Sequence, residues 1–179
     1  MPHLGLLSER VKIVEYDPWW PGLFTSEAVR IQAACAGRLS GVEHVGSTAV
    51  QGLAAKPILD VMLGVPDFAD ARACVPLIES LGYVFLGTYG IEGRFFFRSP
   101  EPCTHHLHLV EKDGKFWQDE ILFRNYLRNH PRAGLAYVEL KRELAEKFAA
   151  NRPAYTEAKG EFIGVCLSNA RSAAHEARE

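Results

Sequence analysis

The stretch 42–65 constrains the fold more than any other part of the chain. Two apolar runs flank a loop of small residues that contains a single lysine, Lys56. Pro57 cannot donate a hydrogen bond to a neighbouring strand and so favours the start or the edge of a strand. The β-branched and aliphatic residues of 58–65 favour extended structure. The stretch therefore predicts two strands joined by a loop.

The loop between these strands has the composition of an anion-binding turn. Gly46 lets the backbone turn or approach a ligand closely, and Ser47 and Thr48 add hydroxyl groups beside backbone N–H groups. Asp60 interrupts the second apolar run, where a carboxylate is costly unless it is paired, hydrogen-bonded or bound to a metal. We therefore interpret Gly46, Ser47, Thr48 and Lys56 as candidate phosphate-binding residues and Asp60 as the first candidate catalytic residue.

This arrangement resembles the nucleotidyltransferase superfamily, and more closely the GrpB family of nucleotidyltransferase-like proteins. In the superfamily, a Gly-Ser element holds the nucleotide phosphates and acidic residues on the following strand hold a divalent metal. Five blocks of the sequence carry the resemblance to GrpB: 44–50, 52–60, 106–108, 123–128 and 155–159.

The resemblance implies a nucleotidyltransferase-like fold, a nucleotide ligand and a divalent metal such as Mg²⁺. It also implies a link to dephospho-CoA kinase, because GrpB domains occur fused behind that enzyme in some bacteria. The sequence departs from the superfamily at Met62, which occupies the position of the second acidic residue of the metal-binding strand. The usual arrangement with two metal ions is therefore not expected.

Composition predicts one globular domain spanning 1–179. The chain is 47% hydrophobic and 23% charged, and its formal net charge of −2 argues against generic nucleic-acid binding. The four cysteines lack the close spacing of zinc or redox motifs, and no apolar run is long enough to cross a membrane. We see no secretory leader and expect a cytoplasmic protein with reduced thiols.

Hydrophobic periodicity predicts a mixed α/β fold. Its sheet is expected to be twisted, with five or six strands, and the helical C-terminal third packs on the sheet. The tryptophan pair that precedes the first helix is either an aromatic plug or a base-stacking platform. The expected strands are 11–16, 83–89, 94–98 and 104–110 besides the two above, and the expected helices are 22–38, 66–82 and the region beyond Gly114, broken near Pro131 and Pro153.

Residues 94–98 and 104–110 read as an antiparallel hairpin with two unlike faces. Side chains two apart on a strand share a face. The predicted polar face therefore carries Arg94, Phe96, Arg98, His106 and His108, and the predicted core face carries Phe95, Phe97, Leu107 and Leu109. A turn centred near Glu101 would place Arg94 opposite His108 and Phe96 opposite His106.

A carboxylate, imidazoles and guanidiniums on one face suit a metal-bound polyphosphate. Arg94 and Arg98 are candidate phosphate ligands, and His108 joins Asp60 as a candidate catalytic residue. Asp60, Glu43, His106 and His108 are the candidate metal ligands. Each assignment has an alternative. The arginines and histidines could form an ordinary solvated face of the sheet, and Asp60 could make a buried hydrogen bond. His44 rather than Glu43 could face the site.

Two functions remain open at this point. The first is a nucleotidyltransferase-like protein that binds a nucleotide or another phosphate ligand with a divalent metal and transfers a nucleotidyl group to an unknown acceptor. The second is a non-catalytic module with the same fold that acts through a protein partner, such as a dephospho-CoA-kinase-type enzyme. In either case Ser47, Lys56, Asp60, Arg94 and His108 are predicted to form one connected site.

Overall fold

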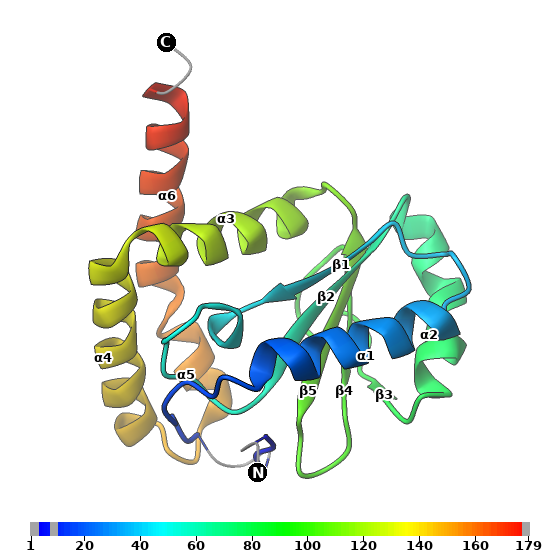
Figure 1. The fold of residues 1–179 in the computed structure, drawn as a ribbon, viewed down its shortest axis with the longest axis horizontal. Helices are drawn as coiled ribbons and strands as arrows, with labels where there is room; N and C mark the ends of the chain where they lie inside the picture. Colours follow the sequence, from blue (N-terminus) through cyan, green and yellow to red (C-terminus); the bar gives the residue numbers. More distant parts are fainter. Residues whose placement is uncertain (1–3, 8–10, 177–179) are drawn as a thin grey trace.

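A computed structural model describes residues 4–7 and 11–176 of the chain. It has a mixed α/β fold with one five-stranded sheet and helices on both faces (Figure 1). The predicted fold class is therefore confirmed. The strands are β1 (Gly41–Val45), β2 (Leu59–Val65), β3 (Val84–Phe85), β4 (Arg94–Arg98) and β5 (His105–Glu111). The α-helices are α1 (Trp20–Ala34), α2 (Ala71–Glu79), α3 (Lys115–Asn129), α4 (Pro131–Lys147), α5 (Arg152–Glu157) and α6 (Gly160–Glu176), and two short 3₁₀ helices are η1 (Ser47–Ala49) and η2 (Phe68–Asp70).

The strand order is β1-β2-β5-β4-β3. β2 and β5 run parallel at the centre, and the other neighbouring pairs are antiparallel. The parallel register aligns Asp60 with His106 and Met62 with His108. Because aligned neighbours share a face, Asp60 and both histidines lie on the same side of the sheet.

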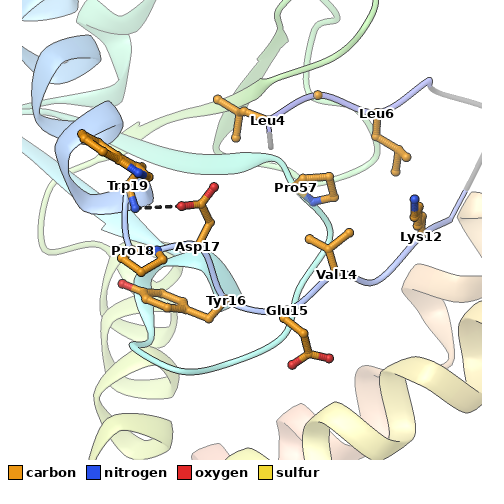
Figure 2. Close-up of a pocket in the computed structure, with 11 residues that line it drawn as sticks. Leu4, Leu6, Lys12, Val14, Glu15, Tyr16, Asp17, Pro18, Trp19 and Pro57 are labelled. Atoms are coloured by element: carbon orange, nitrogen blue, oxygen red, sulfur yellow. Dashed lines mark hydrogen bonds between the residues drawn. The ribbon is translucent and has the colours of Figure 1, made fainter. Parts of the chain in front are cut away.

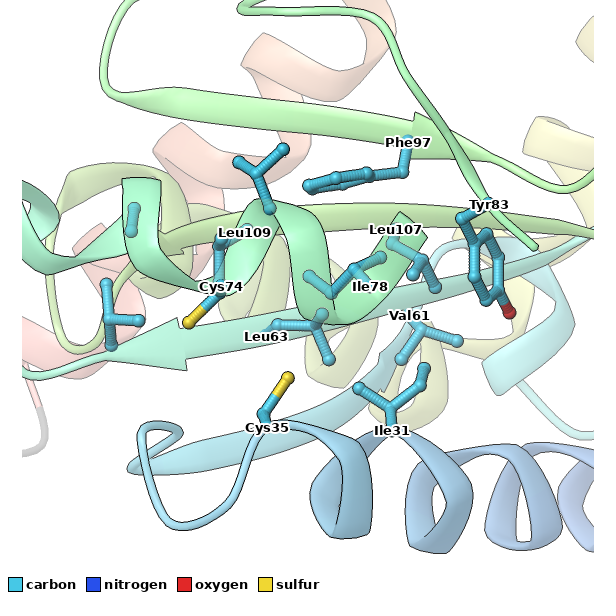
Figure 3. Packing of buried hydrophobic residues seen from close by; sticks show 13 residues of the cluster. Ile31, Cys35, Val61, Leu63, Cys74, Ile78, Tyr83, Phe97, Leu107 and Leu109 are labelled. Carbon is cyan, nitrogen blue, oxygen red and sulfur yellow. The ribbon is translucent and has the colours of Figure 1, made fainter. Parts of the chain in front are cut away.

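The opposite face of the sheet forms the main hydrophobic core. Val61 and Leu63 of β2 and Leu107 and Leu109 of β5 are fully buried there beneath α1 and α2 (Figure 3). The helices contribute side chains such as Ile31, Cys74 and Ile78, and Cys35 joins them directly after α1. Phe97 belongs to this core and Phe95 is partly buried against it, as the alternation in the hairpin predicts.

The face that carries Asp60 is covered by α3 and the following helices. Trp117 of α3 packs on β1 and β2 at Gly41 and Gly64, where a Cβ would approach the indole to 2.7 and 2.8 Å. Glycine at both positions therefore lets α3 lie close to the sheet. α4, α5 and the base of α6 stand beside the sheet on the side away from α2 (Figure 1).

The helical third is joined to the loop after β1 by a second core. Phe123, Leu127, Tyr137 and Val138 pack there with Val50, Leu53, Ala54 and Cys166. α4 begins at Pro131, whose missing N–H is tolerated in the first turn of a helix. Pro153 likewise lies in the first turn of α5, after a break at 148–151. Both predicted helix breaks are therefore confirmed.

Three local predictions are wrong. Residues 11–16 form no strand, and their pairing is an isolated bridge from Val14 to Ala55. Only Val84–Phe85 of the predicted strand 83–89 is extended in the sheet, because Gly87, Tyr89 and Gly90 turn the chain with positive φ. The hairpin register differs by two residues: Phe96 lies opposite His108, and Arg98 lies opposite His106. A shift of two keeps each side chain on its predicted face, since the alternation has a period of two.

Within residues 4–7 and 11–176, no helix is both long and apolar enough to cross a membrane. Trp20 is fully buried against Ala55 and Leu59, whereas Trp19 is 67% exposed. The aromatic-plug interpretation therefore fits Trp20. Of the predicted domain 1–179, residues 1–3, 8–10 and 177–179 lie outside the described part of the chain.

Candidate functional site

Asp60 is the centre of the polar face. It lies near the start of β2, opposite Val45 of β1, and its side chain is 30% exposed. Gly46 follows β1 with φ +69°, and a Cβ at this position would lie 2.5 Å from Asp60 Oδ2. The glycine is thus required both by the backbone conformation and by the carboxylate that lies against it.

Two histidines and two arginines form a hydrogen-bonded chain through Asp60. His106 Nδ1 lies 3.1 Å from Asp60 Oδ1, and Arg152 donates to His106 Nε2 at 2.8 Å. On the other side His108 Nε2 lies 3.4 Å from the same Oδ1, and Arg94 Nη1 lies 3.5 Å from His108 Nδ1. Because arginine can only donate, each imidazole accepts from its arginine and donates its N–H to Asp60.

This chain sets the ionisation of the site. Burial alone would raise the pKa of Asp60, but the hydrogen bonds from His106 and His108 hold that pKa well below its usual value. Burial, together with the charge of Arg152, lowers the pKa of His106 to about 4 despite its hydrogen bond to Asp60. At neutral pH the site therefore contains an ionised Asp60 beside a neutral His106.

A cluster of lysines surrounds the loop after β1 and the start of β2. Lys141 of α4 is 2% exposed, and its Nζ donates to Ser47 Oγ at 3.0 Å and to the carbonyl of Ala54. Lys56 and Lys159 place their ammonium groups 5.2 and 4.7 Å from the ring centroid of Tyr155. We call Lys56, Lys141 and Lys159 the lysine cluster.

The lysine cluster is poorly compensated. Burial and the charge of Lys159 lower the pKa of both Lys56 and Lys141 to about 7. Burial also lowers the pKa of Lys159 itself. Within the described ranges 4–7 and 11–176, none of the three forms an ion pair with a carboxylate. Lys141 is buried, whereas Lys56 and Lys159 are partly exposed and interact with the charge of Asp60. Cations that repel one another in a region of low dielectric favour the entry of an anion.

A second carboxylate comes from α3. Burial raises the pKa of Glu120, and the charge of Asp60 raises it further, while His108, Lys159 and Arg94 act in the opposite direction. Glu120 is therefore electrostatically coupled to both the Asp60 chain and the lysine cluster. Strand β2 itself has Met62 at the position where the superfamily has a second acid.

The predicted site residues differ in how they relate to Asp60. Arg94 lies 3.5 Å from His108, and the charge of Asp60 acts to raise the pKa of Lys56. Ser47 contacts Lys141 rather than Asp60 or His108. Arg98 shares their face beside His106, is half-exposed, and lies 3.9 Å from Glu101.

Two predicted residues have other partners. Thr48 is buried, and its hydroxyl lies 3.0 Å from His44 Nε2 on the core side of the sheet, where His44 stacks on Phe24. Glu43 is on the face of Asp60, but its carboxylate accepts from Arg124 at 2.7 Å. His44 is thus turned away from the site.

Sequence reasoning missed Lys141, Arg152 and Glu120, and Lys159 entered it only within the block 155–159 that resembles GrpB. One signal for Lys141 was available: it follows Tyr137 by four residues and so shares the apolar face of its helix, where a lysine is unusual. No local signal marks Arg152 or Glu120, because each is one charged residue among many on a helix.

Two surface pockets lie beside the N-terminal segment. The larger, of about 1360 Å³, includes Arg152 of the Asp60 chain in its lining. A pocket of about 710 Å³ is lined by N-terminal residues such as Leu4, Val14, Tyr16 and Trp19 together with Pro57 (Figure 2). None of the polar side chains around Asp60 lines it. The candidate site is therefore defined by converging polar groups on the sheet, not by this pocket.

Comparison with known proteins agrees with the resemblance seen in the sequence. The family described as "GrpB protein" matches residues 10–169. The chain belongs to the GrpB family. A GrpB crystal structure from Enterococcus faecalis is similar with a TM-score of 0.82 and 33% identity, covering 89% of this chain and 96% of that one.

Curated relatives of GrpB type span most of the chain. A UPF0157 protein of Pseudomonas aeruginosa is 39% identical over 173 residues, which are 92% of this chain and 69% of the relative. The glutamate-rich protein GrpB of Alkalihalophilus pseudofirmus is 31% identical and is covered to 98%. A dephospho-CoA kinase of Mycolicibacterium paratuberculosis matches over 76 residues at 36% identity, 41% of this chain and 19% of the kinase.

The fold is shared with a nucleotidyltransferase at low identity. A structure of the Cid1 poly(U) polymerase bound to MgATP is similar to this GrpB chain with a TM-score of 0.50 and 12% identity. The match covers 82% of this chain and 50% of Cid1. At this identity the likeness concerns the fold alone.

Proposed function

We propose that this GrpB protein binds a phosphate-bearing ligand, a nucleoside triphosphate with Mg²⁺, on the polar face around Asp60. The observation that carries the proposal is the lysine cluster: Lys141 donates to Ser47, and the charges of Lys56 and Lys159 act on Lys141. Among the described residues, none of the three lysines forms an ion pair with a carboxylate. Oriented donors and positive charges in a region of low dielectric bind phosphate oxygens strongly. Gly46, Lys56, Arg94 and Arg98 complete the proposed phosphate contacts.

The metal is proposed to arrive with the ligand. Among the described residues, no three His, Cys, Asp or Glu side chains are arranged to hold an ion. This fits Mg²⁺, which is commonly bound by one or two carboxylates together with substrate phosphates. Asp60 is the proposed carboxylate, whereas both nitrogens of His106 already have hydrogen-bond partners. A bound ion would neutralise negative charge on the phosphates.

The reaction we propose is transfer of a nucleotidyl group to an acceptor. In it the lysine cluster would hold the phosphates and stabilise the charge that moves to the leaving pyrophosphate. His106 and His108 would act as positioning residues, since their N–H groups orient Asp60. Glu120 stands as the second carboxylate of the site and the candidate acceptor of the attacking group's proton.

Calorimetry with ATP, CTP, GTP and UTP in Mg²⁺ tests this function. We expect binding of at least one nucleotide by the wild type, and an affinity at least tenfold lower for Asp60→Asn and for Lys141→Met. Lys147→Met is the matched control, because Lys147 is an exposed lysine of the same helix. Absence of binding to every nucleotide at millimolar concentration would reject the proposal.

The local match to dephospho-CoA kinase favours a second function, support of such an enzyme as a non-catalytic partner. Co-purification and kinase assays with the enzyme of the same organism test it. The partner function predicts a complex that raises the yield or thermal stability of the kinase and that forms equally well with Asp60→Asn. A complex that requires Asp60 would instead favour the nucleotide site.

A further inference from the structure

The loop between β3 and β4 presents a tyrosine in an unusual backbone conformation. Tyr89 has φ +47°, and the neighbouring Gly87, Gly90 and Gly93 have φ +65°, +80° and +73°. A left-handed backbone is disfavoured for a side chain as large as tyrosine, and such residues concentrate at functional sites. The Tyr89 side chain is nonetheless 63% exposed, so burial does not explain its placement.

A buried arginine of the candidate site holds this loop. Arg94 Nη2 donates to the carbonyls of Thr88 and Tyr89 at 3.2 and 3.1 Å. The same guanidinium lies beside His108 and over the ring of Phe116. Arg94 is only 6% exposed. The position of Tyr89 is therefore linked directly to the side chains that orient Asp60.

The rings of Tyr89 and Phe96 form a stack that ends at the histidines. Their centroids are 4.9 Å apart with an interplanar angle of 19°. Phe96 in turn lies 5.2 and 5.3 Å from His106 and His108. Phe96 and Asp60 are on strands separated by β5, so they lie on the order of 10 Å apart. Tyr89 is thus the exposed outer ring of an aromatic row that begins beside Asp60.

We propose that Tyr89 is a stacking platform for a planar aromatic ring of the ligand, a nucleobase, while the lysine cluster holds the phosphates of the same molecule. This inference rests on the proposed function and adds to it how the nucleoside end is recognised. Stacking on tyrosine requires only a π face, so several bases would be accepted. A ring that already stacks on Phe96, on a backbone that Arg94 holds, loses little freedom on binding.

The test compares ATP and UTP with inorganic tripolyphosphate, each titrated with Mg²⁺ in a calorimeter. Tyr89→Ala is expected to bind ATP and UTP about ten- to a hundredfold more weakly, the range for loss of one base–aromatic stack. Tripolyphosphate affinity should stay unchanged, and Tyr89→Phe should behave as wild type. Tyr89→Leu keeps an apolar side chain without a π face and should resemble Tyr89→Ala, which separates stacking from loop packing.

Trp19→Ala is the matched control, since Trp19 is equally exposed but lies at the N-terminal pocket (Figure 2). It should bind all three probes as wild type does. Unchanged ATP and UTP affinity in Tyr89→Ala, or a loss in Trp19→Ala instead, overturns the inference and leaves the phosphate site standing. If tripolyphosphate and nucleotides all fail to bind, the proposed function and the inference fall together.

Discussion

Gly46 lies directly against the carboxylate of Asp60, so that a Cβ on Gly46 would come within 2.5 Å of Asp60 Oδ2. The turn after β1 and the Asp60 carboxylate of β2 are therefore packed closely against each other. A larger residue at position 46 would displace the Asp60 side chain. The conformation of the turn after β1 is therefore coupled to the position of the Asp60 carboxylate.

The first prediction is that Gly46→Ala lowers the free energy of unfolding by about 2 kcal/mol or more and abolishes ligand binding. Left-handed backbone strain accounts for about 1–2 kcal/mol, and the contact with Asp60 adds to it. Gly52→Ala is the control, because Gly52 has φ +78° with no atom within 4 Å of a built Cβ. Urea unfolding should show a smaller loss of unfolding free energy for Gly52→Ala than for Gly46→Ala. Equal losses would mean that the Asp60 side chain can move away from the new Cβ at little cost.

The second prediction concerns proton uptake. Lys56 and Lys141 have pKa values lowered to about 7, so bound phosphates should raise these pKa values and draw in protons. Affinity for Mg²⁺-triphosphate should therefore be higher at pH 6.5 than at pH 8.5. Calorimetry at pH 7.5 in buffers of different ionisation enthalpy should show that the wild type takes up protons on binding. The number of protons taken up should be smaller for Lys141→Met. Proton release on binding would contradict this arrangement.

The third prediction follows from the same lysines in the free protein. Their folded pKa lies below the unfolded value, so between about pH 7 and 10 the unfolded chain binds more protons, and stability rises with pH in this window. Replacing Lys141 by methionine should remove part of that rise. Urea midpoints at pH 7 and pH 9 measure it, and a wild-type stability that falls over this range would count against the buried lysines.

The fourth prediction concerns acid. Burial lowers the pKa of His44 to about 4. Because the unfolded histidine takes up protons at higher pH than the folded one, stability should fall as pH drops from about 6.5 to 4, by at most about 1.4 kcal/mol per pH unit for this residue. His44→Gln keeps a polar partner for Thr48 and should make the pH dependence shallower. An unchanged slope would show that His44 is protonated in the folded state.

The fifth prediction tests Arg152. Its guanidinium donates to His106 Nε2 and lowers the pKa of that imidazole. Arg152→Met should raise the pKa of His106, as followed by NMR titration, and weaken phosphate binding about tenfold through loss of a charged donor. Arg132 of α4 is exposed, so Arg132→Met should change neither quantity.

Much of the fold follows from local patterns in the chain. The alternation of residues 94–98 and 104–110 was enough to sort polar from core side chains, and this survived a register error of two residues because two is the period of a strand. Similarly, Asp60 stood out as a carboxylate within an apolar run. What these patterns lacked was the geometry of the turn at 99–104, which sets the pairing of β4 with β5.

The cationic half of the site could be found only in three dimensions. Lys141 meets Ser47 across 94 residues of sequence, and Arg152 meets His106 across 46. Arg124 lies in the block 123–128 that resembles GrpB, and only the folded chain shows that it donates to Glu43 and to the carbonyl of His44. Strand periodicity determined which side chains share a face of the sheet, because that depends on neighbours along one strand. Which helix charges reach that face depended on the packing of α3 to α6, because contacts between distant segments leave no periodic signal in the chain.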